Sequence, residues 1–319
     1  MKIGFIGLGN AGGKLAGNLL SNGVELVVRD LDRGAAEPFL ERGAGFAASP
    51  AAMARDCDIV ITCLPSPAAS RAVMEGEDGV LAGIGPGKIW AEMSTTEASE
   101  VQALAKAVEA TGAEAIECPV SGGCHRAATG NISIFAGGSR ATFERMLPVL
   151  KILGRRILHT GDLGTASVLK VMTNYLATAN LLTLCEALVT MKAAGLDLAT
   201  TYEAITISSG TSFVAETEGQ VILNGSRDIE FTMDLVLKDI GFFQEIAERH
   251  GVPLEISPLM IDIMRDGQRC YGERANSDDL NRPLEEATGL DITAPGFPAQ
   301  MVDDEPRDLG DEVVPRSRR

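Results

Sequence analysis

A short glycine-rich segment behind the first apolar run constrains this chain most. Ile3-Gly4-Phe5-Ile6 is typical of a buried strand, and Gly7-Leu8-Gly9-Asn10-Ala11-Gly12 follows it directly. In a G-x-G-x-x-G turn that opens a helix, the first glycine permits a tight turn, the second lets the backbone approach a pyrophosphate, and the third lets the helix pack against the strand. Amide groups at the start of that helix then face the phosphates. The segment therefore predicts a dinucleotide site formed by Gly7, Leu8, Gly9, Asn10, Ala11 and Gly12.

An acidic residue ends the next apolar run. Leu26-Val27-Val28 is typical of a second strand, and Asp30 lies 18 residues after Gly12. At this spacing an acid accepts hydrogen bonds from the adenosine ribose hydroxyls, and its charge repels a 2′-phosphate. Asp30 therefore favours NAD over NADP. Two alternatives stay open: Arg29 or Arg33 could meet a phosphate, or Asp30 could be a solvated acid at a strand end.

Length and charge limit the classes of partner. A chain of 319 residues is long enough for two domains with their own cores. A net charge of −16 argues against nucleic acids and anionic membrane surfaces as partners. We expect no membrane span, and no signal peptide because the chain begins with a buried strand. The six cysteines form no C-x-x-C pair and have no histidine at ligand spacing, which predicts neither disulfides nor a metal. We therefore expect a cytoplasmic location.

Two kinds of periodicity divide the chain. Up to residue 163, short apolar runs alternate with helical stretches, which is typical of a parallel sheet with helices on both faces. Residues 165–194 form a run of 30 residues without Pro or Gly, which predicts one long helix linking two domains or two subunits. We therefore expect an α/β protein with a Rossmann-type doubly wound sheet at 1–163, an all-helical domain at 164–290, and an acidic, Pro-containing peripheral tail at 291–319. The expected strands are Lys2–Ile6, Glu25–Val28, Ile59–Thr62, Ile89–Ala91, Glu114–Glu117, Ser133–Ala136 and Arg156–His159; the later helices are Leu198–Ser208, Thr232–His250, Pro258–Gly267 and Asp278–Thr288.

Three segments follow expected strands and should meet at one edge of the sheet, because doubly wound sheets bind ligands at the carboxyl ends of their strands. They are Leu64-Pro65-Ser66, Met93-Ser94-Thr95-Thr96 and Pro119-Val120-Ser121-Gly122-Gly123. The last presents consecutive backbone amides beside a hydroxyl, which suits a carboxylate. Lys170 and Asn174 lie one turn apart on the long helix and share a face. Lys170 is either a solvated lysine or an enclosed one whose lowered pKa suits general acid–base catalysis.

Four motifs together resemble the β-hydroxyacid dehydrogenases, the family that includes 3-hydroxyisobutyrate dehydrogenase and tartronate semialdehyde reductase. They are Gly7-Leu8-Gly9-Asn10-Ala11-Gly12, Pro119-Val120-Ser121-Gly122-Gly123, Gly161-x-x-Gly164 followed by Lys170 and Asn174, and Lys238-Asp239. The resemblance extends from Met1 to about Gly267. The resemblance implies hydride transfer between a 3-hydroxy acid and NAD. It implies that Leu64, Pro65, Thr95 and Lys238 contact the cofactor, that Ser121, Gly122 and Gly123 hold the substrate carboxylate, and that Lys170 and Asn174 are catalytic. It also implies a homodimer or homotetramer.

Three positions depart from the family pattern. Ala11 stands where Met is common, and Thr173 stands where a second Asn is usual. Arg126 stands where family members have a small residue, so it could bind a second anionic group on the substrate; otherwise it is a surface arginine paired with an acid. The alternatives are thus a reductase of a larger or doubly anionic aldehyde, or an NAD-binding regulatory protein without catalysis. An imine reductase is disfavoured because Lys170 is present.

Overall fold

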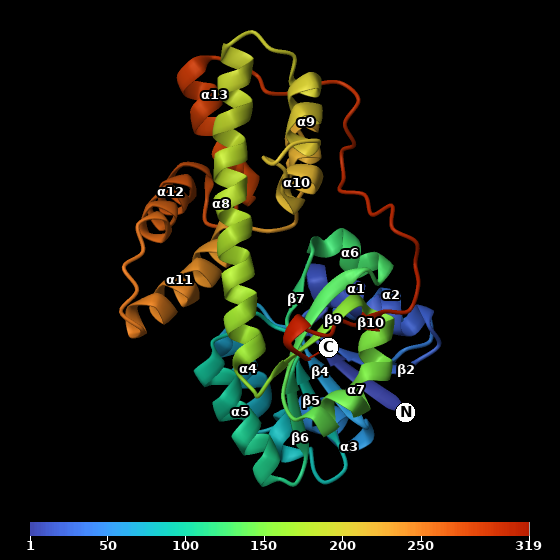
Figure 1. Ribbon diagram of the computed structural model, residues 1–319. Helices are drawn as coiled ribbons and strands as arrows, with labels where there is room; N and C mark the ends of the chain where they lie inside the picture. Colours follow the sequence, from blue (N-terminus) through green and yellow to red (C-terminus); the bar gives the residue numbers. More distant parts are fainter. Residues whose placement is uncertain (319) are drawn as a thin grey trace. The chain divides into compact units, whose positions relative to one another are not determined.

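The computed structural model describes residues 1–318 and divides into two compact units (Figure 1). The sheet unit comprises Met1–Lys170 together with the segment from Asp303 onward, and the helical unit comprises Val171–Val302. The sequence places the boundary at 163/164 and sets the tail apart. In the structure the boundary instead falls inside one continuous helix, and the tail is divided between the two units.

The sheet unit is a doubly wound, mostly parallel sheet, as predicted. Its strand order is β10-β9-β8-β6-β5-β4-β1-β2-β3, and β7 pairs with β8 outside this path. The strands from β3 to β6 are parallel, whereas β8 is antiparallel to β6 and to β7. The bounds are β1 (Lys2–Ile6), β2 (Glu25–Arg29), β3 (Gly45–Phe46), β4 (Ile59–Thr62), β5 (Ile89–Glu92), β6 (Glu114–Glu117), β7 (Val120–Ser121), β8 (Ile132–Gly137), β9 (Gly154–Gly161) and β10 (Asp311–Glu312).

Local sequence signals start several helices of this unit. Ser49 and Ser66 each precede a proline, and each side chain accepts a hydrogen bond from a backbone amide of the first turn, which offsets the missing partners at a helix start. Asp32 caps another helix in the same way. The helices are α1 (Asn10–Ser21), α2 (Arg33–Leu40), α3 (Pro50–Asp56), α4 (Pro67–Glu75), η1 (Val80–Ala82), α5 (Ala98–Ala110), α6 (Gly123–Thr129), α7 (Arg140–Leu153), the first turns of α8 (Thr165–Ala193), and η3 (Arg316–Arg318).

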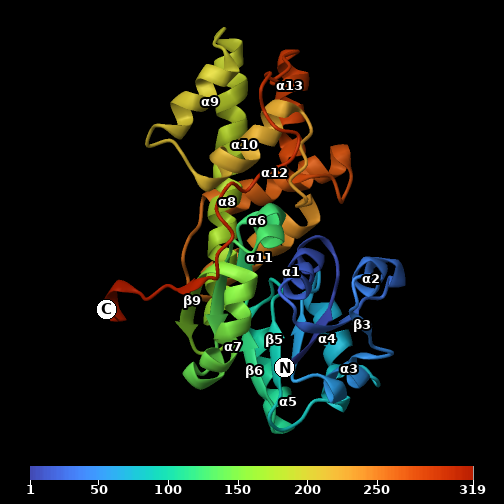
Figure 2. The same cartoon turned by 90° about the vertical axis from the view of Figure 1, so that its right-hand side faces the viewer.

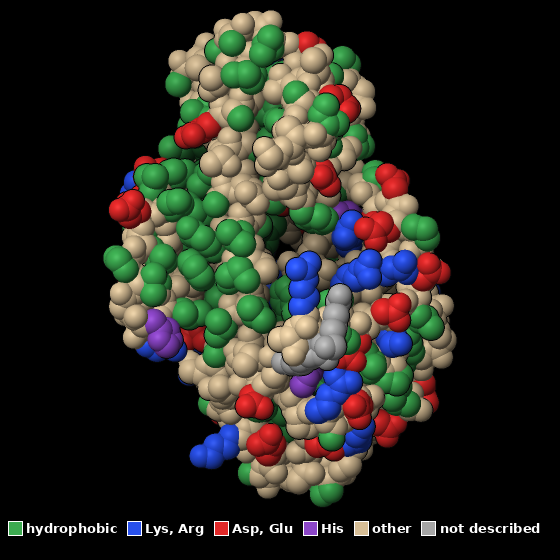
Figure 3. All heavy atoms as spheres, viewed as in Figure 1, with side chains coloured by type: hydrophobic (Ala, Val, Ile, Leu, Met, Phe, Trp, Pro, Cys, Tyr) green, Lys and Arg blue, Asp and Glu red, His purple; other side chains and the backbone are tan. Residues whose placement is uncertain are grey.

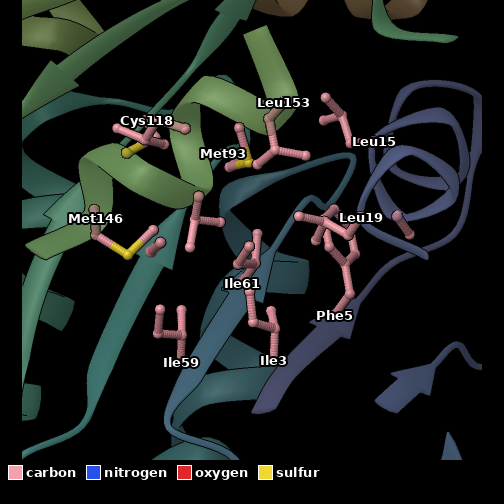
Figure 4. Packing of buried hydrophobic residues seen from close by; sticks show 14 of the residues in the cluster. Ile3, Phe5, Leu15, Leu19, Ile59, Ile61, Met93, Cys118, Met146 and Leu153 are labelled. Atoms are coloured by element: carbon pink, nitrogen blue, oxygen red, sulfur yellow. The ribbon is translucent and has the colours of Figure 1, made fainter. Parts of the chain in front are cut away.

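The sheet has an apolar core on each face. On one face Phe5 and Ile61 pack with Leu15 and Leu19 of α1 and with Met146 of α7 (Figure 4). On the other face, Trp90 and Val60 lie among side chains of α3, α4 and α5. Because successive strand residues point to opposite faces, both cores are filled by the same short strands. This is why the central strands are almost entirely apolar.

The helical unit contains helices alone apart from one isolated β-bridge, Thr232 to Asn276. Figure 2 shows α9 and α10 beside the upper part of α8, and their apolar residues share one buried cluster with Ile292. A second cluster joins α11, α12 and η2. The sequence does not predict α10. The bounds are α9 (Leu198–Thr206), α10 (Phe213–Asn224), α11 (Met233–Arg249), α12 (Ile256–Tyr271), η2 (Ser277–Asn281) and α13 (Arg282–Thr288).

The long helix α8 is apolar over much of its surface. Contrary to the expectation from sequence, its length and composition would allow it to cross a membrane. The core helix of a globular domain meets the same two criteria, so one such helix is weak support for a membrane location. The cytoplasmic location stays a prediction.

The last part of the tail is bound to the sheet unit. Asp303, whose side chain is 1% exposed, accepts hydrogen bonds from Thr129 and from the Asn131 amide at 2.7 Å. Further on, β10 adds a parallel strand beside β9. Burial alone would raise the pKa of Asp303, but the hydrogen bonds from Thr129 and Asn131 and the charge of Arg126 lower it. The part of the tail from Asp303 onward is therefore an integral edge of the sheet unit.

Replacing Asp303 by Ala removes the acceptor for two side chains of the α6–β8 connection. We expect the free energy of unfolding of the sheet unit to fall by about 1–3 kcal/mol at pH 7. Because the folded-state pKa is lowered, this contribution is present above about pH 4 and is lost as the pH falls through the folded-state value. Urea unfolding followed by the fluorescence of Trp90, the single tryptophan, measures it. Asp304→Ala, at the exposed neighbouring position, is the control; equal stability of the two variants would contradict the expectation.

Candidate active site

The carboxyl ends of four parallel strands lie in one row across the sheet. Ile6 of β1 is in register with Thr62 of β4, Thr62 with Glu92 of β5, and Glu92 with Glu117 of β6. The segment after each strand therefore leaves the sheet at the same edge. Four segments begin within a few residues of this row, as predicted for a doubly wound sheet. They are the glycine-rich turn, Leu64-Pro65, Ser94-Thr95 and the segment Val120 to Gly123.

The three glycines of the first turn stand in different surroundings. Gly7 has φ +97°, and a Cβ there would lie 2.2 Å from the Cys63 carbonyl oxygen. A Cβ on Gly12 would lie 2.1 Å from the carbonyl oxygen of Gly7, so α1 approaches the turn too closely for any side chain. Beside Gly9 nothing lies within 4 Å of a Cβ position. Gly9 thus leaves open space at the start of α1, a cradle that fits a pyrophosphate.

Asp30 is fixed at the end of β2 by the turn itself. One oxygen of its carboxylate accepts a hydrogen bond from the Leu8 amide at 2.7 Å, and the other from the Asp32 amide at 3.0 Å. Both flanking arginines are engaged elsewhere. Arg29 donates to the carbonyl oxygens of Ala47 and Ala48, and Arg33 stacks over Phe46 at 4.8 Å.

Ser94 and Glu92, for which no role was predicted from the sequence, hold the segments after β4 and β5 together. The Ser94 hydroxyl accepts a hydrogen bond from the Leu64 amide at 2.7 Å, and it donates to the buried carboxylate of Glu92. Burial raises the pKa of Glu92, and the hydrogen bonds from Ser94 oppose that rise. The sequence signal is a glutamate that ends an otherwise apolar strand, since such a charge needs a partner.

The glycine pair after β7 forms a backbone turn suited to an anion. Ser121 pairs with Ser133 of β8, which fixes the start of the turn. Gly122 and Gly123 then both have positive φ, +128° and +84°, a conformation that favours glycine. Consecutive amides in such a turn converge on a small anion.

Arg126 contacts this turn and is bound by the tail. A Cβ on Gly122 would lie 3.3 Å from Cδ of Arg126, so the arginine side chain lies against the glycine. The guanidinium forms an ion pair with Glu305 at 2.9 Å and lies 3.9 Å from Asp303. The structure thus places Arg126 beside the turn and gives it an acidic partner.

Lys170 is enclosed by the protein. It lies in the second turn of α8, and the residue is only 7% exposed. Of the two interpretations open from the sequence, the solvated lysine is therefore wrong. An enclosed amine is unusual, because lysine is almost never fully buried unless it is paired or functional.

The other two predicted polar residues are joined within the helical unit. Asn174 of α8 donates a hydrogen bond to Asp239 of α11, and Lys238 forms an ion pair with the same carboxylate at 2.7 Å. Asp239 is buried and ties α8 to α11. It belongs to the Lys238-Asp239 motif, whose family resemblance implies a role for Lys238 alone. Among residues 1–318, no group of His, Cys, Asp or Glu side chains is arranged to hold a metal ion.

Two protein families match most of the chain between them. Residues 2–161 match the NAD binding domain of 6-phosphogluconate dehydrogenase. Residues 164–284 match the family described as NAD-binding of NADP-dependent 3-hydroxyisobutyrate dehydrogenase. The two matches meet between β9 and α8.

Individual relatives match nearly the whole length. The 2-(hydroxymethyl)glutarate dehydrogenase of Eubacterium barkeri is 33% identical over 92% of this chain and 98% of its own. The 3-sulfolactaldehyde reductase of Escherichia coli is 32% identical over 80% of this chain and 86% of its own. A crystal structure of 3-hydroxyisobutyrate dehydrogenase from Salmonella typhimurium superposes with a TM-score of 0.82 at 27% identity, covering 89% of this chain and 99% of that one. The chain therefore belongs to the β-hydroxyacid dehydrogenase family of NAD(P)-dependent oxidoreductases.

Proposed function

We propose that this protein interconverts a small 3-hydroxy acid and its semialdehyde by hydride transfer with NAD, and that Lys170 is the general acid–base. The observation that carries the proposal is the enclosed amine of Lys170 in the unit that also holds the glycine-rich turn and the Ser121-Gly122-Gly123 turn. Names of relatives support the substrate class, since they include dehydrogenases and reductases of short functionalised acids.

The protein's own residues bind the substrate, orient it beside the cofactor and transfer a proton. The amides of Ser121, Gly122 and Gly123 hold the substrate carboxylate and orient the carbinol carbon. Leu64, Pro65 and Thr95 would line the nicotinamide side of the site, where NAD, when bound, would supply the hydride acceptor. Lys170 takes the hydroxyl proton as the carbonyl forms and returns it in the reductive direction. Asn174, one turn further along α8, orients the reacting oxygen or the amine, and Lys238 lies near the cofactor.

NAD is the preferred cofactor in this proposal. Asp30 carries a negative charge where a 2′-phosphate would lie, and the turn holds it there through the Leu8 amide. Arg29 and Arg33, which could offset that charge, are turned to Ala47, Ala48 and Phe46. Turnover with NAD should therefore exceed turnover with NADP in the same assay.

We also propose a homodimer or homotetramer formed through the helical unit. Leu176 of α8 is 51% exposed and Ile207, after α9, is 84% exposed. Figure 3 shows hydrophobic side chains gathered on a face of this unit. Exposed apolar patches are typical of protein interfaces. Light scattering of the purified protein measures the mass directly, and a monomer at micromolar concentration would contradict the proposal.

Gly9→Ala tests the dinucleotide turn without disturbing the fold. The new methyl group meets no protein atom within 4 Å, and the φ of −64° suits alanine, so the melting temperature should be retained. The methyl group occupies the space of the pyrophosphate, so the Kd for NAD should rise about tenfold or more. Gly17→Ala, on the same helix, is the control. Calorimetric titration with NAD measures both variants, and equal affinities would refute this placement of the cofactor.

Lys170→Ala tests the reaction itself. Oxidation of a panel of 3-hydroxy acids is followed by the absorbance of the reduced nicotinamide. With the best substrate, kcat should fall about 10²–10⁴-fold because a positioned general acid–base is lost, while the Kd for NAD is retained. Lys192→Ala, near the other end of α8, should leave kcat unchanged. Turnover of the Lys170 variant near the wild-type rate would exclude Lys170 as the acid–base.

The position of Arg126 favours a second substrate class, the doubly anionic hydroxy acids or aldehydes. Arg126 lies against Gly122, and a relative acts, by its name, on a glutarate derivative. If a doubly anionic substrate binds there, its second anion displaces Glu305 from the guanidinium.

Arg126→Ala should then raise KM for a dianionic hydroxy acid and leave KM for a monoanionic one unchanged, and Glu305→Gln should lower KM for the dianion. Steady-state kinetics with one acid of each kind measures both changes. If Arg126→Ala changes neither KM, Arg126 is only a partner of the tail.

A further inference from the structure

The first turn of α8 rests on a carboxylate from another part of the chain. Glu117, at the end of β6, has no exposed surface. One of its oxygens accepts hydrogen bonds from the amides of Gly164 at 2.6 Å and Ala166 at 2.9 Å. The other accepts from the amide of Ser167 at 3.1 Å and from the Ser167 hydroxyl. All four donors to the two oxygens come from residues 164–167, at the start of α8.

This arrangement satisfies groups that a helix start leaves without partners. The first amides of a helix have no acceptor within the helix, and together they carry a partial positive charge. A buried carboxylate offsets that charge and receives charge-assisted hydrogen bonds, which are stronger and more directional than neutral ones. The hydrogen bonds therefore fix the position of the start of α8 along its axis, and its rotation about that axis, relative to the end of β6.

The neighbouring strand leaves room for the carboxylate. Gly137, in register with Glu117 on β8, has no side chain, and a Cβ there would lie 2.4 Å from the Glu117 oxygen. On the helix side, Gly164 adopts φ +96° and aims its amide at the same oxygen. Glycines on both sides therefore shape the space that Glu117 fills.

Glu117 stands between the two parts of the proposed site. Lys170 follows Ser167 by three residues, so its backbone lies one turn above the carboxylate. In the other direction along the chain, Glu117 leads through Cys118 and Pro119 to Ser121 and its glycine pair. One side chain thus joins the end of β6, which leads within a few residues to the carboxylate-binding turn, to the helix that carries the amine.

We propose that Glu117 is a positioning residue for catalysis, which sets the place of the Lys170 amine relative to the Ser121-Gly122-Gly123 turn by holding the first turn of α8. This inference rests on the proposed role of Lys170 as general acid–base. Glu117 takes no part in the proton transfer. Its effect on the rate passes through the geometry and the electrostatic surroundings of Lys170.

Glu117→Gln is the central variant. The amide keeps the size of the side chain but turns an NH₂ group toward backbone donors, so the helix start shifts. We expect kcat to fall about 10–100-fold, since displacements near 1 Å cost this much in oriented reactions, and the Kd for NAD to be retained. The limb of the pH–kcat profile that reports the acid–base should move to lower pH, because the negative charge that favours an ammonium is gone.

A double-variant cycle separates positioning from general damage to the fold. If Glu117 acts only through Lys170, adding Glu117→Gln to Lys170→Ala should lower kcat no further. A purely structural role would lower kcat in both backgrounds and would overturn the proposal. Glu114→Gln, at the other end of β6, makes the same chemical change away from the site and should leave kcat unchanged. Ser167→Ala removes one of the four hydrogen bonds and should give a smaller effect in the same direction, which keeps the test decisive if Glu117→Gln does not fold.

The outcomes distinguish this inference from the proposed function. Normal turnover of Lys170→Ala would refute the function. Slow turnover of Lys170→Ala together with wild-type kcat and pH profile for Glu117→Gln and Ser167→Ala would refute only the positioning role.

Discussion

The register of four parallel strands is the constraint on which the site depends. Ile6, Thr62, Glu92 and Glu117 lie side by side, so the segments that follow them leave the sheet along one edge. Two members of this row are buried carboxylates, and a buried charge persists only when it is paired or hydrogen-bonded. Each finds its donors in a segment just beyond the sheet: Glu92 in Ser94, and Glu117 in the start of α8. The ends of the strands thus set the positions of the functional segments.

Acidic residues have a comparable role elsewhere in the chain. Asp239 joins Asn174 to Lys238 within the helical unit. In the tail, Asp303 holds the connection after α6, and Glu305 and Glu312 pair with arginines of the sheet unit. Part of the negative charge of the chain therefore lies in carboxylates that form specific ion pairs and hydrogen bonds. Each exposed ion pair of this kind contributes little to the free energy of unfolding. The buried carboxylate of Asp303 contributes more, because water cannot replace the protein donors to which it is hydrogen-bonded.

Much of the sheet unit could be predicted because its signals are local. The bounds of β1, β4 and β6 agree with the expected strands, and α8 ends within one residue of the expected helix. The two-residue strands β3, β7 and β10 carry no periodicity and exist only because a neighbouring strand offers hydrogen bonds. Helix α10 was not predicted from its local pattern, although Ser212 caps it. The division of the tail between two units depends on contacts with residues more than a hundred positions away, such as Arg126 and Asn131.

The sequence alone determined the glycine-rich turn, the glycine pair after β7, the order of the longer strands and of most helices, and the candidate residues, because backbone freedom and periodicity act over a few neighbouring residues. Only the tertiary structure decided that Lys170 is enclosed, that Arg29 binds the carbonyls of Ala47 and Ala48 and Arg33 lies over Phe46, that Glu305 pairs with Arg126, and that Glu117 holds the start of α8. Each of these depends on which distant groups surround a side chain. Burial and electrostatic pairing are properties of that three-dimensional environment, and no local pattern in the chain encodes them.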